Sequence, residues 1–246
     1  MAAVTELLRV DGLRKSFGGV TAVDGCSLSV AEGTVTALIG PNGSGKTTLF
    51  DLVTGYRKPD AGRVYFAGRD VTGHSPGRLY RAGLSRTFQQ ARVFPQLTVV
   101  ENLVAAAGHR WWQLASPRVS AADRKRAEEL LAEFDLTGEA DRLAAQLSYG
   151  RRKLLEFAAV LMSAPRLVLL DEPAAGVNPV LVERMEQHVR ARHAAGVTFL
   201  IVEHDLSFVM RLCDPVIVLD AGRPISQGDP TLIQADPRVL DAYLGG

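Results

Sequence analysis

Apolar and polar positions alternate along residues 7–30, between glycine turns expected at Asp11-Gly12, Gly18-Gly19 and Glu32-Gly33. A period of two broken by turn residues predicts short antiparallel strands. Another strand is expected at 64–66, because this apolar triplet follows a Pro-Asp-Ala-Gly turn at 59–62. The first part of the chain therefore predicts a small antiparallel β region.

Later apolar runs show no alternation, which is typical of strands buried on both faces of a parallel sheet. These runs are 34–39, 167–170, 198–202 and 216–219. A helix is predicted after the second run, because Asn178 suits the N-cap, Pro179 the first helical position and Gly196 the end. Its apolar residues recur every four positions, at Leu181, Met185 and Val189. Such strands and helices in alternation predict an α/β fold.

Helix signals replace strand signals between residues 91 and 150. Thr98 followed by Glu101 matches a capping box, and Ser120 followed by Asp123 matches its aspartate variant. The second cap leads into apolar residues on one helical face: Ala127, Leu130, Leu131 and Phe134. This segment is therefore expected to be a helical insertion.

Composition excludes some classes of partner. The 246 residues carry 28 basic and 27 acidic side chains, so no excess of positive charge favours nucleic acid. The two cysteines, Cys26 and Cys213, lie far apart without metal-ligand spacing and indicate a reducing compartment. No signal peptide pattern and no apolar stretch of membrane-spanning length occurs. We expect a soluble cytosolic chain, which is compatible with binding to a membrane partner.

A complete phosphate-loop pattern, G-x-x-x-x-G-K-T, directly follows the apolar run 34–39. A strand, a glycine-rich turn and a helix start leave backbone N–H groups directed at one small volume, which suits phosphate. Lys46 can reach the β- and γ-phosphates, and the Thr47 hydroxyl can bind Mg²⁺. The residues expected to hold the nucleotide phosphates here, and to bind ATP if the family resemblance below holds, are Gly40, Pro41, Asn42, Gly43, Ser44, Gly45, Lys46, Thr47 and Thr48. The loop alone does not separate kinases, GTPases, helicases and transport ATPases.

Two adjacent carboxylates, Asp171 and Glu172, end the apolar run 167–170. Consecutive side chains of a strand point to opposite sides. If this strand lies beside the phosphate loop, Asp171 reaches the Mg²⁺ shell and Glu172 orients or deprotonates the attacking water. Acidic residues at strand ends are often only loop starters, but the phosphate loop favours the catalytic interpretation.

The segment 147–151, Leu-Ser-Tyr-Gly-Arg, lies at the start of another predicted helix. Ser148 is a plausible N-cap, and a helix N-terminus with a small glycine beside it can receive an anion. Taken alone, this pentapeptide is an ordinary helix cap. Because this segment lies after the phosphate loop and the predicted helical insertion, the anion-binding interpretation is favoured over an ordinary cap.

These motifs together resemble the ATP-binding cassette (ABC) ATPases over nearly the whole chain. The resemblance implies a P-loop NTPase (RecA-like) core, an N-terminal antiparallel β subdomain and an inserted α-helical subdomain. It also implies that the signature Ser148, Tyr149 and Gly150 of one subunit closes over ATP held by the other. The implied organisation is one domain over 1–246, with 1–90 and 151–246 as the catalytic core and β subdomain, and 91–150 as the helical subdomain.

Three further residues take roles only from this resemblance. Phe17 matches the aromatic residue that stacks on adenine, and Gln89 matches the glutamine that touches Mg²⁺ or water. His204 matches the histidine that contacts the γ-phosphate. The implied catalytic residues are thus Glu172, His204 and Gln89, and the implied metal ligands are Thr47, Gln89 and Asp171. Two positions depart from the family pattern: Arg151 replaces a common glutamine, and Asn178, in the dimer-interface loop, replaces a common aspartate.

The closest resemblance is to the first of the two ATPases in branched-chain amino-acid importers. It is carried by the segments 16–25, 86–89, 147–150, 172–179 and 236–245. The implied cofactors are ATP and Mg²⁺. The implied partners are a second ABC ATPase subunit, two transmembrane permease subunits and, indirectly, an extracytoplasmic solute-binding protein, which places the chain on the cytoplasmic face of the membrane. The permease is expected to contact residues 89–97, where Phe94 and Pro95 form an apolar knob; the alternative is that Phe94 packs under its own loop.

Several alternatives remain open. ATPases of urea or amide importers and of lipopolysaccharide exporters share much of the same motif set. Three other classes fit the sequence less well. A DNA-repair member would carry a long coiled coil after the loop that contains Gln89 (the glutamine loop), but the stretch from Gln89 to Leu147 is too short for one. A translation-associated member would carry two cassettes, but only one phosphate loop is present, and a small-molecule kinase would not explain the segment 147–151 or His204.

Overall fold

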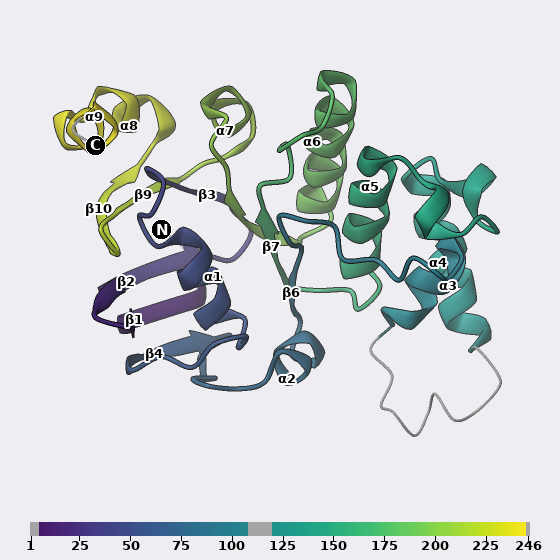
Figure 1. The fold of residues 1–246 in the computed structure, drawn as a ribbon, viewed down its shortest axis with the longest axis horizontal. Coiled ribbons are helices and arrows are strands. Elements are labelled where there is room, and N and C mark those ends of the chain that lie inside the picture. Colours follow the sequence, from purple (N-terminus) through teal and green to yellow (C-terminus); the bar gives the residue numbers. More distant parts are fainter. Residues whose placement is uncertain (1–4, 108–119, 245–246) are drawn as a thin grey trace.

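The computed structural model describes residues 5–107 and 120–244, arranged as two β-sheets with helices packed on them (Figure 1). The first sheet is antiparallel and has the strand order β2-β1-β4-β5. Its strands are β1 (Glu6–Phe17), β2 (Val20–Ala31), β4 (Ala61–Phe66) and β5 (Arg69–Asp70). This sheet is the N-terminal antiparallel region that the alternation predicts.

The turn expected at Asp11-Gly12 is instead a bulge inside the long strand β1. The pairing register of β1 with β2 shifts between Val10 and Leu13, and Gly12 there has a φ of 56°. Its N–H donates to Ser27 Oγ at 2.8 Å. A β-bulge takes up one extra residue without ending the strand, so each 12-residue strand continues through its glycine.

The second sheet has the order β10-β9-β3-β8-β7-β6 and is parallel except for its edge strand β10. Its strands are β3 (Val35–Ile39), β6 (Leu84–Arg86), β7 (Leu167–Asp171), β8 (Thr198–Val202), β9 (Val216–Asp220) and β10 (Arg223–Gly228). Four of them coincide with the four predicted apolar runs. The three-residue strand β6 was not expected, because it is too short to show a period.

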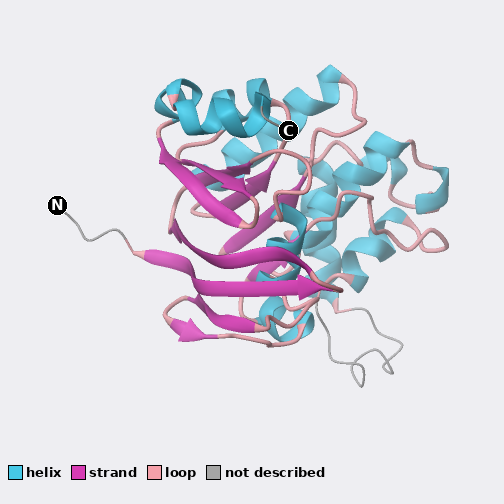
Figure 2. Cartoon of the chain, turned by 60° about the vertical axis from the view of Figure 1, so that its left-hand side comes forward, coloured by secondary structure: helices cyan, strands magenta, loops and turns pink. Residues whose placement is uncertain are grey.

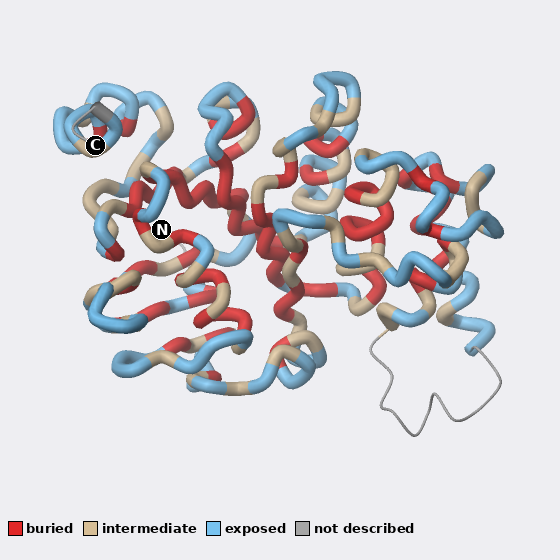
Figure 3. Tube along the Cα trace, viewed as in Figure 1, coloured by how far each residue is buried: buried red, intermediate tan, exposed pale blue. Residues whose placement is uncertain are grey.

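Both faces of this second sheet are covered, and its central strands divide their side chains between two cores. In β8, Phe199 and Ile201 face one core while Leu200 and Val202 face the other. The first core lies against the helices, and the second lies against the antiparallel sheet and the helix that follows the phosphate loop. Figure 3 shows this burial concentrated along the central strands.

The helices, cyan in Figure 2, pack on both faces of the second sheet: α1 and α2 join the core shared with the antiparallel sheet, and α3 to α9 join the other core. They are α1 (Lys46–Val53), α2 (Pro76–Arg81), α3 (Val99–Ala105), α4 (Ala121–Glu133), α5 (Tyr149–Val160), α6 (Pro179–Ala194), α7 (Leu206–Leu212), α8 (Pro230–Ala235) and α9 (Pro237–Leu244), with 3₁₀ helices η1 (Thr137–Glu139) and η2 (Ala144–Gln146). Thr98 and Glu101 form the predicted capping box, and Asn178 Oδ1 caps α6 by accepting from the Leu181 N–H at 2.9 Å. Within residues 5–107 and 120–244, no helix is both long and apolar enough to cross a bilayer.

The proposed helical subdomain 91–150 contains α3, α4, η1 and η2. Its residues 108–119 lie outside the described residues, as does the end of the C-terminal segment that carries part of the family resemblance. The suggested boundary at residue 150 falls within the first turn of α5. The division into subdomains therefore stays a prediction.

Candidate active site

The phosphate loop connects β3 to α1 and is held closely by its neighbours. Gly45 has a φ of 100°, and a Cβ added there would lie 2.2 Å from Ala22 O of β2. A Cβ at Gly40 would lie 2.0 Å from Leu219 O of β9. Such distances leave no room for a side chain, so both glycines are required by close backbone approach as well as by conformation. The loop is thus set rigidly at the carboxyl ends of the parallel strands.

Lys46 places its ammonium group inside this loop. Its Nζ donates to Gly40 O at 2.8 Å and to Pro41 O at 2.9 Å. Burial lowers the pKa of Lys46, and the nearby carboxylates of Glu172 and Asp171 oppose that shift. Only main-chain carbonyls and the Ser44 hydroxyl accept from this ammonium among the described residues, so a phosphate oxygen can take their place.

Thr47, Gln89 and Asp171 line one cleft of about 590 Å³. They come from α1, from the loop after β6 and from the end of β7. Together they offer a hydroxyl, an amide and a carboxylate oxygen, all of the hard oxygen type that Mg²⁺ prefers beside phosphates. The donor set therefore fits the metal that the sequence predicts.

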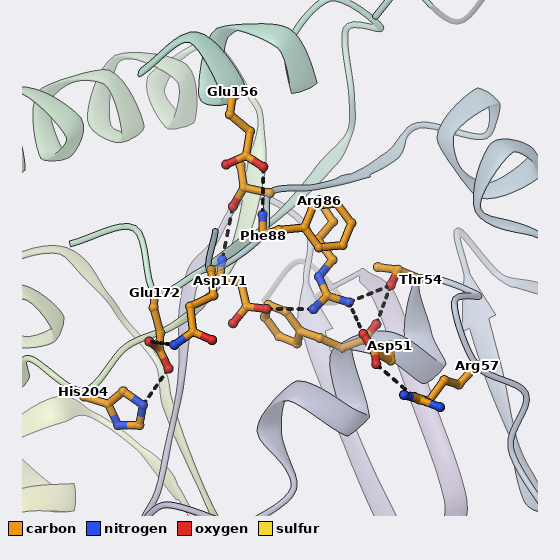
Figure 4. Close-up of polar contacts among 12 residues, drawn as sticks. Asp51, Thr54, Arg57, Arg86, Phe88, Glu156, Asp171, Glu172 and His204 are labelled. Atoms are coloured by element: carbon orange, nitrogen blue, oxygen red, sulfur yellow. Dashed lines mark hydrogen bonds and ion pairs between the residues drawn. The ribbon is translucent and has the colours of Figure 1, made fainter. Parts of the chain in front are cut away.

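Asp171 is already engaged with a buried arginine. The Arg86 guanidinium bridges two carboxylates, at 2.7 Å from Asp171 Oδ2 and 2.7 Å from Asp51 Oδ1 (Figure 4). Burial raises the pKa of Asp171, and the Arg86 cation counteracts that shift. The Asp171 N–H donates to Thr87 Oγ1 at 3.2 Å, which fixes the strand end beside β6. Arg86 thus neutralises and orients the carboxylate that is expected to serve the metal.

Glu172 lies between two of the other predicted catalytic residues. Gln89 Nε2 donates to Glu172 Oε2 at 2.8 Å, and His204 Nε2 lies 2.8 Å from Glu172 Oε1 (Figure 4). A carboxylate oxygen only accepts, so the shared proton sits on His204 Nε2. Both carboxylate oxygens are therefore directed by side chains from separate segments of the chain.

The backbone at Glu172 adopts the left-handed region, with a φ of 47°. This conformation costs a non-glycine residue about 1–2 kcal/mol and is found where surrounding contacts enforce it. Here the Glu172 N–H donates to Val202 O at 2.9 Å, and Lys153 Nζ donates to Glu172 O at 3.2 Å. The turn lifts the carboxylate out of the strand and toward His204.

Glu203 fixes the loop that carries His204. Its Oε1 accepts from the Ala174 N–H at 2.7 Å, and its Oε2 accepts from the His204 N–H at 3.0 Å. Burial raises the pKa of Glu203, and these backbone N–H groups oppose the shift. Glu203 therefore joins the loops after β7 and β8 and sets the backbone from which His204 reaches Glu172.

The signature residues lie away from the phosphate loop of their own chain. Figure 1 places α5 and α1 on opposite sides of β7. Ser148 Oγ accepts from the Arg151 N–H at 3.3 Å and so caps α5, while the Tyr149 residue is 38% exposed. The Arg151 side chain donates to Asp135 O at 2.5 Å. Arg151, which replaces the glutamine common in the family, therefore binds a carbonyl of its own chain.

Phe17 lies at the end of β1, next to the hairpin that leads into β2. Its residue is 38% exposed, and the Arg57 guanidinium carbon lies 5.0 Å from the ring centroid. An accessible aromatic ring of this kind can stack on a planar base. Phe94 is 59% exposed, so its ring does not pack under its own loop.

Sequence reasoning does not predict the contacts of three charged residues: Arg86, Lys153 and Glu156. In the sequence, Arg86 stands only as the first residue of the segment 86–89 that carries part of the family resemblance. Glu156 is buried in α5 beside Leu155 and Phe157, and burial raises the pKa of its carboxyl group to about 7. A lone charge within an apolar helical stretch is the one sequence signal that marks it, but that signal does not identify a partner.

Comparison with known proteins gives two family matches. Residues 23–175 match the model described as ABC transporter. Residues 223–246 match the model described as branched-chain amino acid ATP-binding cassette transporter.

Individual relatives match over nearly their full lengths. The high-affinity branched-chain amino acid transport ATP-binding protein BraF of Pseudomonas aeruginosa is 38% identical over 97% of this chain and 98% of its own. The probable branched-chain amino acid transport ATP-binding protein LivG of Methanocaldococcus jannaschii is 38% identical over both complete chains. The solved ADP conformation of MJ1267, an ATP-binding cassette of an ABC transporter, superposes with a TM-score of 0.88 at 38% identity, covering 98% of this chain and 100% of that one.

Proposed function

The chain belongs to the ABC transporter family and is an ATPase of that family, and from this premise we propose that it powers the import of branched-chain amino acids. The C-terminal family match and the names of the full-length relatives support this solute class. The observation that carries the catalytic part is the Glu172 carboxylate, held by Gln89 on one oxygen and by His204 on the other.

Glu172 is the proposed general base. A water that attacks the γ-phosphate must lose a proton as the new P–O bond forms, and the Glu172 carboxylate accepts it. His204 Nε2 and Gln89 Nε2 fix the direction of this carboxylate before the reaction. Ordering the base in advance removes a reorganisation cost from the transition state.

Lys46 and the N–H groups of residues 40–48 are proposed to bind the phosphates. Thr47, Gln89 and Asp171 are proposed to hold Mg²⁺ in the cleft that they line. Mg²⁺, when bound, neutralises charge on the β- and γ-phosphates. Phe17 is proposed to stack on the adenine ring, because its ring is accessible at the end of β1.

A second ATPase subunit is proposed to complete the site. Ser148, Tyr149 and Gly150 lie at the N-terminus of α5, on the far side of β7 from the phosphate loop (Figure 1). Their placement suits a head-to-tail dimer in which each signature closes over ATP on the other subunit. Asn178 is proposed to lie in the loop at that interface, in addition to capping α6.

Two permease subunits, and through them a solute-binding protein, are the proposed further partners. The Phe94 ring is exposed beside the glutamine loop and offers an apolar anchor for a cytoplasmic helix of a permease. This contact would keep the chain on the cytoplasmic face of the membrane.

ATPase measurements in proteoliposomes test the solute class. The chain would be reconstituted with its proposed permease pair and solute-binding protein, and leucine would be compared with urea and with no solute. We expect the leucine-loaded binding protein to stimulate hydrolysis, and Glu172→Gln to abolish the stimulation. Stimulation by urea alone would reject the proposed solute class.

A further inference from the structure

Three side chains of the signature helix α5 point at the glutamine loop. Tyr149, Lys153 and Glu156 are spaced i, i+4 and i+7, so they share one face of the helix. Tyr149 Oη lies 3.4 Å from Gln89 O and donates to it. The same helix that carries Ser148 at its N-terminus therefore touches the loop that carries Gln89.

Glu156 joins the two ends of this loop. Its Oε1 accepts from the Phe88 N–H at 3.2 Å (Figure 4) and from the Arg92 N–H at 3.1 Å. Phe88 and Arg92 stand directly before and directly after the segment 89–91. The residue is only 4% exposed, and its Oε2 has no hydrogen-bond partner among the described residues. Burying a carboxylate with one oxygen unpartnered is costly. The hydrogen bonds from the Phe88 and Arg92 N–H groups partly offset this cost.

Lys153 extends the same contact to Glu172. Its Nζ donates to Glu172 O at 3.2 Å and to Phe88 O at 3.5 Å, and the residue is buried. Glu172 is the residue with the left-handed backbone, so this bond supports the turn that presents its carboxylate. Lys153 thus ties the loop and the proposed base to one helix.

We propose that Glu156 and Lys153 are positioning residues that set Gln89 against Glu172 and transmit movements of the signature helix to that pair. The inference rests on the proposed roles of Gln89 and Glu172. Neither residue needs to touch ATP. Glu156 acts through the backbone on both sides of the segment 89–91, and Lys153 acts through the backbone of Glu172. Because α5 also carries the signature, docking of a second subunit on Ser148 would change the same contacts.

Two substitutions at Glu156 separate hydrogen bonding from charge. Glu156→Met and Glu156→Gln both remove the charge at similar volume, but only glutamine keeps a side-chain oxygen that accepts from Phe88 and Arg92. We expect Glu156→Met to lower kcat by about 10–100-fold, as small misplacements of reacting groups do, with the ATP KM within threefold of wild type. Glu156→Gln should stay within about threefold of wild-type kcat. Glu129→Ala, an exposed carboxylate of α4, is the control and should change neither parameter.

A double-mutant cycle tests whether Glu156 acts through Gln89. If it does, Gln89→Ala combined with Glu156→Met should have the same kcat as Gln89→Ala alone. Independent, multiplicative losses would overturn the inference, as would equal kcat values for Glu156→Met and Glu156→Gln. An unchanged kcat for Gln89→Ala alone would instead reject the proposed role of Gln89. If Glu156→Met does not fold, Lys153→Met in the same cycle, with Lys153→Arg as the conservative variant, decides the question by the same criteria.

Discussion

The guanidinium of Arg86 lies 2.7 Å from Asp171 Oδ2, and both side chains are only 4% exposed. The contact joins the short strand β6 to the end of β7 and places a permanent positive charge beside an aspartate expected to serve Mg²⁺. The same guanidinium reaches Asp51 on α1 at 2.7 Å. The Arg86 cation thus links Asp51, on the helix that follows the phosphate loop, to Asp171, at the end of β7. Both carboxylates line the proposed metal cleft.

Removing this cation should destabilise the chain. Arg86→Met leaves Asp171 in a buried site without its counter-ion, and breaking a buried pair from one side costs about 3–5 kcal/mol. We expect a loss of this size in the free energy of unfolding, measured by urea denaturation without nucleotide. Arg57→Met removes the more exposed partner of Asp51 and should cost less than about 1 kcal/mol. Equal losses in the free energy of unfolding of the two variants would contradict a stabilising role of the buried Arg86–Asp171 pair.

Glu172→Gln should reduce turnover without preventing ATP binding. Loss of a general base lowers the rate by about 10²–10⁴-fold. The amide keeps an oxygen that accepts from His204, and its NH2 group can donate to Gln89 Oε1 once the Gln89 amide turns over, so the local structure should persist. Single-turnover hydrolysis and ATP titration would measure the two quantities. Glu183→Gln is the control, because Glu183 is an exposed carboxylate that lines a cavity together with Glu172, and it should leave both quantities unchanged. A wild-type rate in Glu172→Gln would remove Glu172 from the catalytic role.

Lys46→Ala should weaken nucleotide binding itself. The ammonium lies inside the phosphate loop, where hydrogen bonds from a charged group contribute about 1.5–3 kcal/mol each. We expect ATP affinity to fall by at least tenfold, measured by calorimetric titration. Lys58→Ala, at an exposed position, is the control. Normal ATP affinity in Lys46→Ala would contradict the phosphate-binding role.

Glu156 should make stability depend on pH. Burial raises the pKa of its carboxyl group from 4.5 to about 7, against the opposing effects of Lys153 and Arg92. The folded chain therefore holds a proton that the unfolded chain releases between these values, so stability declines as the pH rises through this window.

Glu156→Gln does not titrate and isolates this effect. Its free energy of unfolding relative to wild type should rise by up to about 3 kcal/mol between pH 4.5 and 7 and then level off. Denaturation of both proteins at a series of pH values measures the difference. A difference that does not change with pH would show that the Glu156 carboxyl group has an ordinary pKa.

Local sequence was sufficient wherever spacing along the chain defines the structure. The four long apolar runs became the central strands, and the caps at Thr98, Ser148 and Asn178 each make the expected hydrogen bond. The family was also accessible from the motifs alone. In each case the evidence lies within a few neighbouring residues.

Features that depend on contacts between distant residues were not accessible. The three-residue strand β6 exists because it pairs with β7, some 80 positions later, and Gly12 forms a bulge because the strand β2 continues beside it. No pattern in the sequence around Arg86 or Glu156 predicts which residues they contact. Their roles follow only from packing.

The order of residue types along the chain supplies the chemical groups of this protein: a phosphate loop, a pair of carboxylates, a glutamine, a histidine and a serine-glycine signature. Folding is what brings Gln89 and His204 to Glu172, joins Arg86 to Asp171, and places α5 against the backbone on both sides of Gln89. The two kinds of feature differ because they depend on residues at different separations along the chain. Strand and helix signals arise from neighbours along the chain, whereas the direction of a buried carboxylate is set by residues that only folding brings within hydrogen-bond distance.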